Sequence, residues 1–220
     1  MNKDWSEQNK AIQLQLKKKD SFEAGIASLL VLRKELMVQA KAFKTQLKAE
    51  DFSAMPHRNA KGYHSKTIAY SLWHIFRIED IVAHTLIAGD EQVFFRGNYQ
   101  RKTNSPIITT GNELSGEDII NFSKQLSLDG LYDYIEAVDA ESTKILKSLT
   151  YEDGKRKITD QERLVLENLS VVSDDENAVW LIDYWCGKDI KGLIQMPFSR
   201  HWIMHIEACI RIMNRVLPIE

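Results

Sequence analysis

Long stretches of helix-forming residues, rarely interrupted, set the strongest constraint on how this chain can fold. Only 10 glycines and 4 prolines occur among its 220 residues. Most of them fall between stretches in which apolar side chains recur every three or four positions, which places those side chains on one face of an α-helix. No segment shows the sustained apolar and polar alternation of a half-buried strand. The sequence therefore predicts an all-α protein.

Four long helical regions are expected, at residues 3–50, 66–88, 116–149 and 193–216. The first should break near residues 19–21, where Asp20 or Ser21 can cap a new helix. The second should stop at Gly89, and the third can bend near Gly130. Residues 52–65, 91–115 and 150–192 have mixed patterns and should be irregular or carry short elements. Four amphipathic helices in this order predict a helical bundle.

Charge and composition exclude several classes of protein. The formal charge of −2 comes from 31 acidic and 29 basic residues spread along the chain, so no basic stripe indicates a nucleic acid and no polybasic cluster indicates a membrane. No apolar run is long enough to span a bilayer. The polar N-terminus lacks the apolar core of a signal peptide, which predicts a cytoplasmic protein. Cys186 and Cys209 should then be reduced thiols.

The pair His201 and His205 is the first candidate for metal binding. Four residues advance a helix by about 40°, so both imidazoles project from one face and can converge on one ion. The pair lies beside an apolar stripe, which consists of Phe198, Trp202, Ile206, Cys209, Met213 and Val216. Both rings should therefore face the bundle interior, where an unpaired imidazole must be desolvated. The alternative is two buried histidines that hydrogen-bond to backbone or carboxylate groups.

His74 is the third candidate ligand. It falls on the apolar margin of the second helix, with Tyr70, Ile78 and Ile81. The polar face of that helix collects Lys66, Arg77, Asp80 and His84. His84 is therefore expected at the surface, whereas His74 should point inward. His57 and His64 lie in the preceding loop and are not expected to be ligands.

Three neutral imidazoles leave coordination positions open, which is typical of a reactive metal site and not of a closed structural one. Zinc, nickel and iron all accept imidazole, so the metal stays open. A metalloprotease helix carries a glutamate after its first histidine, and Trp202 occupies that position here. A di-iron bundle requires Glu-x-x-His pairs, and none occurs near these histidines.

The segment Ser71–Asp80, which contains Trp73-His74, together with the HxxxH pair on the last helix, resembles the DinB/YfiT-like superfamily. Members of that superfamily are four-helix bundles that bind a divalent metal through three histidines so placed. The resemblance covers roughly residues 20–216. It implies one domain over residues 1–220, with an N-terminal extension at 1–19, an additional N-terminal helix and an insertion before the last helix.

Carried over residue by residue, the ligands of the superfamily fall on His74, His201 and His205. Some relatives are transferases or isomerases that use bacillithiol, mycothiol or glutathione, and others resemble metal-dependent hydrolases. This sequence departs from the common pattern where Glu207-Ala208-Cys209 replaces the usual glycine-glutamine. The stretch between the third and last helices is also longer than usual.

Glu79 is the candidate catalytic carboxylate, because it lies on the apolar side of the second helix, where a charge needs a partner. It can act as a general base or orient a ligand histidine; the alternative is an ion pair between helices. Arg200 can meet an acidic substrate, although a surface role is the simpler interpretation. Cys209 is expected in the core and not as a fourth ligand. Four tryptophans can line either a pocket or the core: Trp73, Trp180, Trp185 and Trp202.

These features favour a metal-dependent transferase or hydrolase that acts on a small molecule, with or without a low-molecular-weight thiol. A non-catalytic, metal-stabilised bundle with a stress-related or sensory role is the alternative. A third hypothesis has buried histidines and no metal. Apolar faces left over in a bundle would allow a homodimer.

Overall fold

The computed structural model describes residues 2–217, and its regular elements are helices throughout that range. The prediction of an all-α protein is thus confirmed. The longer helices are α1 (Lys3–Leu16), α2 (Phe22–Gln46), α3 (Ile68–Asp80), α6 (Gly116–Gln125), α7 (Leu128–Ser148) and α12 (His201–Val216). The predicted domain limits also include residues 1 and 218–220, which lie outside the described residues.

Shorter elements connect and cover the long helices. They are η1 (Lys19–Ser21), η2 (Ala49–Ser53), η3 (Gly62–His64), the π-helical η4 (Ile81–Ala88), α4 (Val93–Arg96), α5 (Tyr99–Thr103), α8 (Tyr151–Gly154), α9 (Asp160–Asn168), α10 (Trp180–Cys186), α11 (Ile190–Ile194) and the π-helical η5 (Met196–Arg200). The predicted break at residues 19–21 is confirmed by η1. The predicted stop at Gly89 is confirmed as well, because this residue ends η4 in the left-handed conformation.

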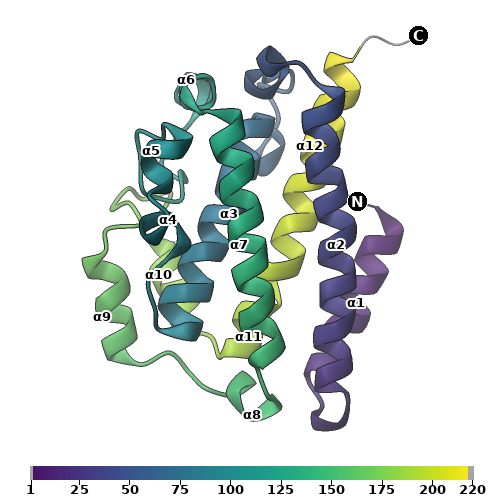
Figure 1. Ribbon diagram of the computed structural model, residues 1–220, viewed down its shortest axis with the longest axis vertical. Coiled ribbons are helices and arrows are strands. Elements are labelled where there is room, and N and C mark those ends of the chain that lie inside the picture. Colours follow the sequence, from purple (N-terminus) through teal and green to yellow (C-terminus); the bar gives the residue numbers. More distant parts are fainter. Residues whose placement is uncertain (1, 218–220) are drawn as a thin grey trace.

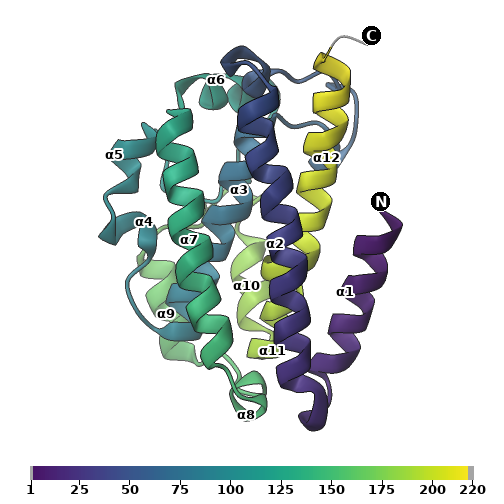
Figure 2. The ribbon, with the colours of Figure 1, turned by 45° about the vertical axis from the view of Figure 1, so that its right-hand side comes forward.

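The helices α2, α3, α7 and α12 pack around a shared core (Figures 1 and 2). Helix α2 contacts α7 and α12, and α3 contacts the same two helices. Helix α1 packs along α2, at the opposite side of the molecule from α9 and α10. Within residues 2–217, no helix combines the length and the apolar composition that crossing a membrane requires.

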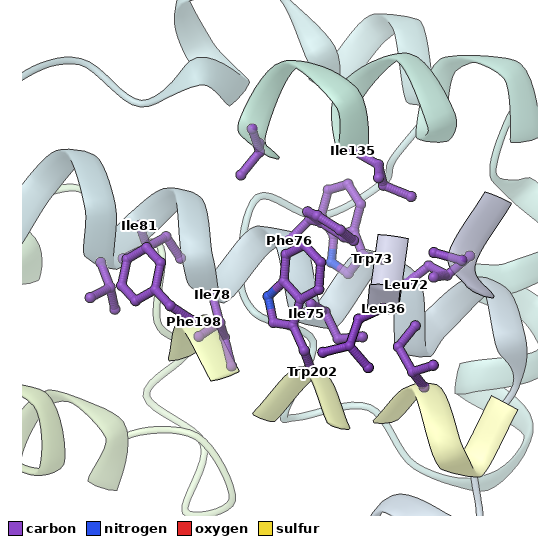
Figure 3. Close-up of a cluster of buried hydrophobic side chains, with 14 of the residues drawn as sticks. Leu36, Leu72, Trp73, Ile75, Phe76, Ile78, Ile81, Ile135, Phe198 and Trp202 are labelled. Carbon is purple, nitrogen blue, oxygen red and sulfur yellow. The ribbon is translucent and has the colours of Figure 1, made fainter. Parts of the chain in front are cut away.

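Large apolar side chains fix the position of α3 against α12. In Figure 3, Phe76 of α3 and Trp202 of α12 lie in one buried apolar cluster, which also contains Trp73 and Ile135. The ring centroids of Phe76 and Trp202 are 4.6 Å apart, and both side chains are fully buried. Because a core packed at this density resists sliding of one helix past another, it sets the height of His74 relative to the last helix.

The prediction of a solvent-facing polar side on α3 and its extension η4 is wrong. Every residue of α3 is buried, and His84 is only 1% exposed. The chain after Gly89 folds back over this face. The Asp80 carboxylate accepts the backbone N–H groups of Val93 and Phe94 at 2.8 and 2.9 Å. Arg77 Nε donates to the carbonyl of Ile108, and His84 Nδ1 pairs with Asp90.

The third helical region consists of two helices and not of one bent helix. Helix α6 ends before Leu126, and Ser127 caps α7 by accepting the N–H of Gly130. Gly130 serves a different purpose from the predicted bend. A Cβ atom there would lie 2.0 Å from the carbonyl oxygen of Lys102, so the glycine lets α5 approach the start of α7.

Candidate metal centre

His74 of α3 meets His201 and His205 of α12 in the interior. The ring centroids lie 4.9 Å apart for His74 and His201, 4.8 Å for His74 and His205, and 4.6 Å for the helical pair. One nitrogen from each ring lies within 4.8 Å of the nitrogens of the others, and all three residues are 5–6% exposed. The structure thus brings together the three histidines that the sequence pattern selected.

The start of α12 is built to place His201 at this position. The π-helical η5 runs directly into α12, so the helix widens by one residue per turn just before His201. Such π-turns are rare and often occur at functional sites. The neighbouring Trp202 points the other way, into the core, and its Nε1 donates to Glu79 Oε2 at 2.7 Å. His201 therefore faces the site, and Trp202 faces the core.

A backbone carbonyl orients His74. Its Nδ1 lies 2.8 Å from the carbonyl oxygen of Thr110 and must donate, because a carbonyl only accepts. This bond fixes the tautomer and leaves Nε2 free as a ligand. The next residue, Gly111, has a φ of +77° and accepts the Tyr70 hydroxyl at 2.9 Å. Tyr70 in turn stacks on the His74 ring, 5.5 Å away at an interplanar angle of 11°.

The other two imidazoles carry buried nitrogens that pair with nothing in the described part of the chain. These atoms are Nδ1 of His201 and Nδ1 of His205. An unpaired polar atom in the interior is costly, and native structures contain few. Three imidazoles with nitrogens this close to one another match the ligand type and number of a divalent metal site. The residues present therefore fit such an ion.

Electrostatics keep all three rings neutral near pH 7. The pKa of His74 is lowered to about 4, chiefly by burial and to a smaller extent by the nearby Lys66, against the Thr110 hydrogen bond, which raises it. Burial also lowers the pKa values of His201 and His205 well below the usual value, with a smaller contribution from the neighbouring histidines. Neutral imidazole is the form that binds a metal, so no proton has to leave first.

The three histidines form part of the wall of a cavity of about 530 Å³. Aromatic side chains from η3 and α10 line it, namely Tyr63, Trp180, Tyr184 and Trp185, and Lys66 and Glu113 add opposite charges. This volume suits a small organic molecule. Helix α10 belongs to the long stretch between α7 and the last helix, so this stretch supplies a wall of the cavity.

Glu79, the candidate catalytic residue, is paired elsewhere. Its two oxygens each accept a hydrogen bond from the Arg33 guanidinium at 2.7 Å, and Glu79 is not among the residues that line the cavity. The alternative interpretation, an ion pair between helices, matches this geometry. Trp202 donates to the same carboxylate, so Glu79 supports the backbone that carries His201.

The other residues selected from the sequence differ in whether they line the cavity. Arg200 is exposed and Cys209 is buried, and neither lines the cavity. His64 Nδ1 lies 2.8 Å from Arg211 Nη2, outside the histidine cluster. Of the four tryptophans, Trp180 and Trp185 line the cavity, while Trp73 and Trp202 are fully buried in the core.

The sequence interpretation missed Glu113 as a site residue. Its Oε1 accepts the Thr109 hydroxyl, and its Oε2 is buried without a partner in the described residues. Glu113 lies in an irregular segment between Gly111 and α6, where no periodic pattern tells which way a side chain points. The one signal in the sequence was that Glu113 lies close to Thr110. The contact of Thr110 with His74 is visible only in the folded structure.

Comparison with known proteins adds no assignment: no protein-family model matches the chain, and no curated protein is significantly similar to it in sequence.

Proposed function

We propose that this protein is a divalent-metal-dependent enzyme, a transferase or hydrolase that acts on a small molecule. One observation carries the proposal. Three buried, neutral histidines converge at the wall of a cavity large enough for a small organic molecule. The helix order and the positions of these histidines also support a place in the DinB/YfiT-like superfamily, as the sequence resemblance implies.

In this proposal His74, His201 and His205 hold zinc, nickel or iron. A metal bound by three imidazoles supplies a Lewis acid with open positions for a substrate oxygen, a thiol or water. The Thr110 carbonyl keeps His74 in the ligating tautomer. Trp180 and Trp185 line the cavity and would pack against a bound substrate.

Glu113 takes the role of proton acceptor that the sequence suggested for Glu79. Its Oε2 has no partner among the described residues, and the carboxylate lines the cavity. The Thr109 hydroxyl holds the other oxygen, which limits the rotation of the group. A general base requires such a placed carboxylate within reach of a thiol or water.

Metal content tests the first part of the proposal. Untagged protein should contain about one equivalent of zinc, nickel or iron by mass spectrometry, as three ligands for one ion imply. His201→Ala should lose the metal, whereas His57→Ala, in the loop outside the cluster, should retain it. Absence of metal in the wild-type protein after reloading with each ion would refute the proposal.

Turnover tests the second part. Metal-loaded protein is assayed against a panel of thiol-transfer and ester substrates, with His74→Ala and Glu113→Gln as variants. His74→Ala should abolish activity together with metal binding. Glu113→Gln should lower kcat by at least about 100-fold with metal content unchanged, as expected for loss of a general base. A metal-loaded protein without turnover on any substrate would instead be the non-catalytic, metal-stabilised bundle.

A further inference from the structure

Lys66 is a partly buried ammonium group in the wall of the cavity. It precedes α3, and its Nζ lies 4.8 Å from the centroid of the Tyr70 ring. Because Tyr70 also stacks on His74, a single aromatic side chain contacts both the ammonium and a ligand histidine. Lys66 is therefore on the metal side of the cavity.

No carboxylate of the described chain pairs with this lysine. Burial lowers the pKa of Lys66, and no anionic neighbour raises it. Lys41 and Lys44 show the usual alternative, since each pairs at 2.8 Å with a surface carboxylate. A cation that has lost part of its hydration without gaining an anion is stabilised by any anion that enters the cavity.

The other charged side chain at the wall is Glu113, and it opposes an anion placed beside it. The anionic group of a ligand therefore belongs near Lys66, and an uncharged or proton-donating group belongs near Glu113. The rest of the wall is mainly apolar and includes five aromatic side chains, among them Trp180 and Tyr184 in edge-to-face contact at 5.7 Å. Aromatic walls favour a flat, apolar ligand body.

We infer that the cavity binds a small aromatic anion, with the anionic group paired to Lys66 and the ring packed against the aromatic side chains of η3 and α10. The inference deepens the proposed function by naming its substrate class, and it rests on that function for the reaction only. The binding step depends on Lys66 and the aromatic wall, so it can be measured with or without a metal.

Phenylacetate and phenylacetamide form a matched pair of probes, because they share size and ring and differ in charge. Their dissociation constants are measured by isothermal titration calorimetry on the zinc-loaded and on the metal-free protein. Phenylacetate should bind at least about tenfold more tightly, as expected for one added ion pair in a partly buried site. Lys66→Gln should remove most of this preference and Lys66→Arg should retain it.

Lys61→Gln is the matched control, because Lys61 is an exposed lysine of the same loop and does not line the cavity. It should leave both constants unchanged. A preference for phenylacetate that survives Lys66→Gln, or equal binding of the two probes to the wild-type protein, would overturn the inference. If the protein binds no metal, the proposed function fails, and the comparison in the metal-free protein still decides the role of Lys66.

Discussion

Two buried polar clusters involve the same helices, α3 and α12, and differ in how fully their side chains are paired. In the first, the Arg33 cluster, Arg33 binds both oxygens of Glu79 and one oxygen of Asp139 at 2.7 Å, and Trp202 donates to Glu79. In the histidine cluster, His201 and His205 keep buried nitrogens without partners. A fully paired carboxylate stabilises the fold, whereas unpaired, converging ligands are available to bind.

Removing Glu79 should break the Arg33 cluster and have the largest effect on stability. Glu79→Ala leaves the buried Arg33 guanidinium with the partly exposed Asp139 as its remaining carboxylate partner and removes the acceptor of Trp202 Nε1. This should lower the free energy of unfolding by about 3–5 kcal/mol. Urea denaturation followed by circular dichroism measures this. Glu167→Ala, which removes an exposed partner of Arg163, is the control and should change little. A similarly small change for Glu79→Ala would contradict the structural role given to this cluster.

Metal should stabilise the histidine cluster by the next largest amount. At a hundredfold excess of free ion over its dissociation constant, binding to the folded state adds about 2.7 kcal/mol. The melting temperature should rise with zinc and fall again with a chelator. In His201→Ala the melting temperature should not depend on zinc. A zinc-dependent rise that persists in this variant would place the metal elsewhere.

Acid should affect the metal-free protein through His74. Since the folded-state pKa of His74, about 4, lies below the unfolded value near 6.5, the unfolded chain binds the proton first as the pH falls. The contribution of His74 is complete above pH 6.5 and is lost as the pH falls towards 4, with about 2 kcal/mol gone at pH 5.

His74→Gln isolates this effect, because glutamine does not titrate. The difference in unfolding free energy between the wild type and His74→Gln is measured at several pH values in the absence of metal. The wild type should lose unfolding free energy relative to His74→Gln as the pH falls from 6.5 to 5. A difference that stays constant over this range would mean that His74 is not buried as a neutral imidazole.

Gly111→Ala should give the smallest effect on stability and a larger one on the site. An alanine at a φ of +77° costs about 1 kcal/mol, and its Cβ would meet Tyr70 Cε2 at 3.1 Å. The neighbouring Thr110 carbonyl, which orients His74, should shift. Zinc affinity should fall by about tenfold or more, as for other losses of a group that orients a ligand. Unchanged affinity, measured by competition with a chromophoric chelator, would show that this carbonyl is dispensable.

The parts of the fold and site that sequence could predict are those with local causes. His201 and His205 lie one helical turn apart, so their shared face follows from the helix geometry. The stop at Gly89 follows from the left-handed backbone preference of glycine. The break at η1 was also placed correctly, although the Ser21 hydroxyl donates to the carbonyl of Gln15 and does not cap α2. His74 was placed correctly because it borders an apolar face of its own helix.

The parts that sequence could not predict depend on contacts between distant segments. Residues 91–115 cover the polar face of α3, so Arg77 and Asp80 are buried although their spacing indicates exposure. Glu79 finds its partner in Arg33, which lies on a different helix. Glu113 reaches the cavity from an irregular segment whose path only the packed structure defines.

The positions of the three histidines along the chain also have a consequence for stability. More than half of the sequence lies between His74 and His201. An ion bound to both residues would therefore close a very long loop of the chain, much as a disulfide does. Closing a loop of that length reduces the entropy of the unfolded chain. The ion would thus act as a reversible cross-link between the C-terminal helix and the first half of the chain.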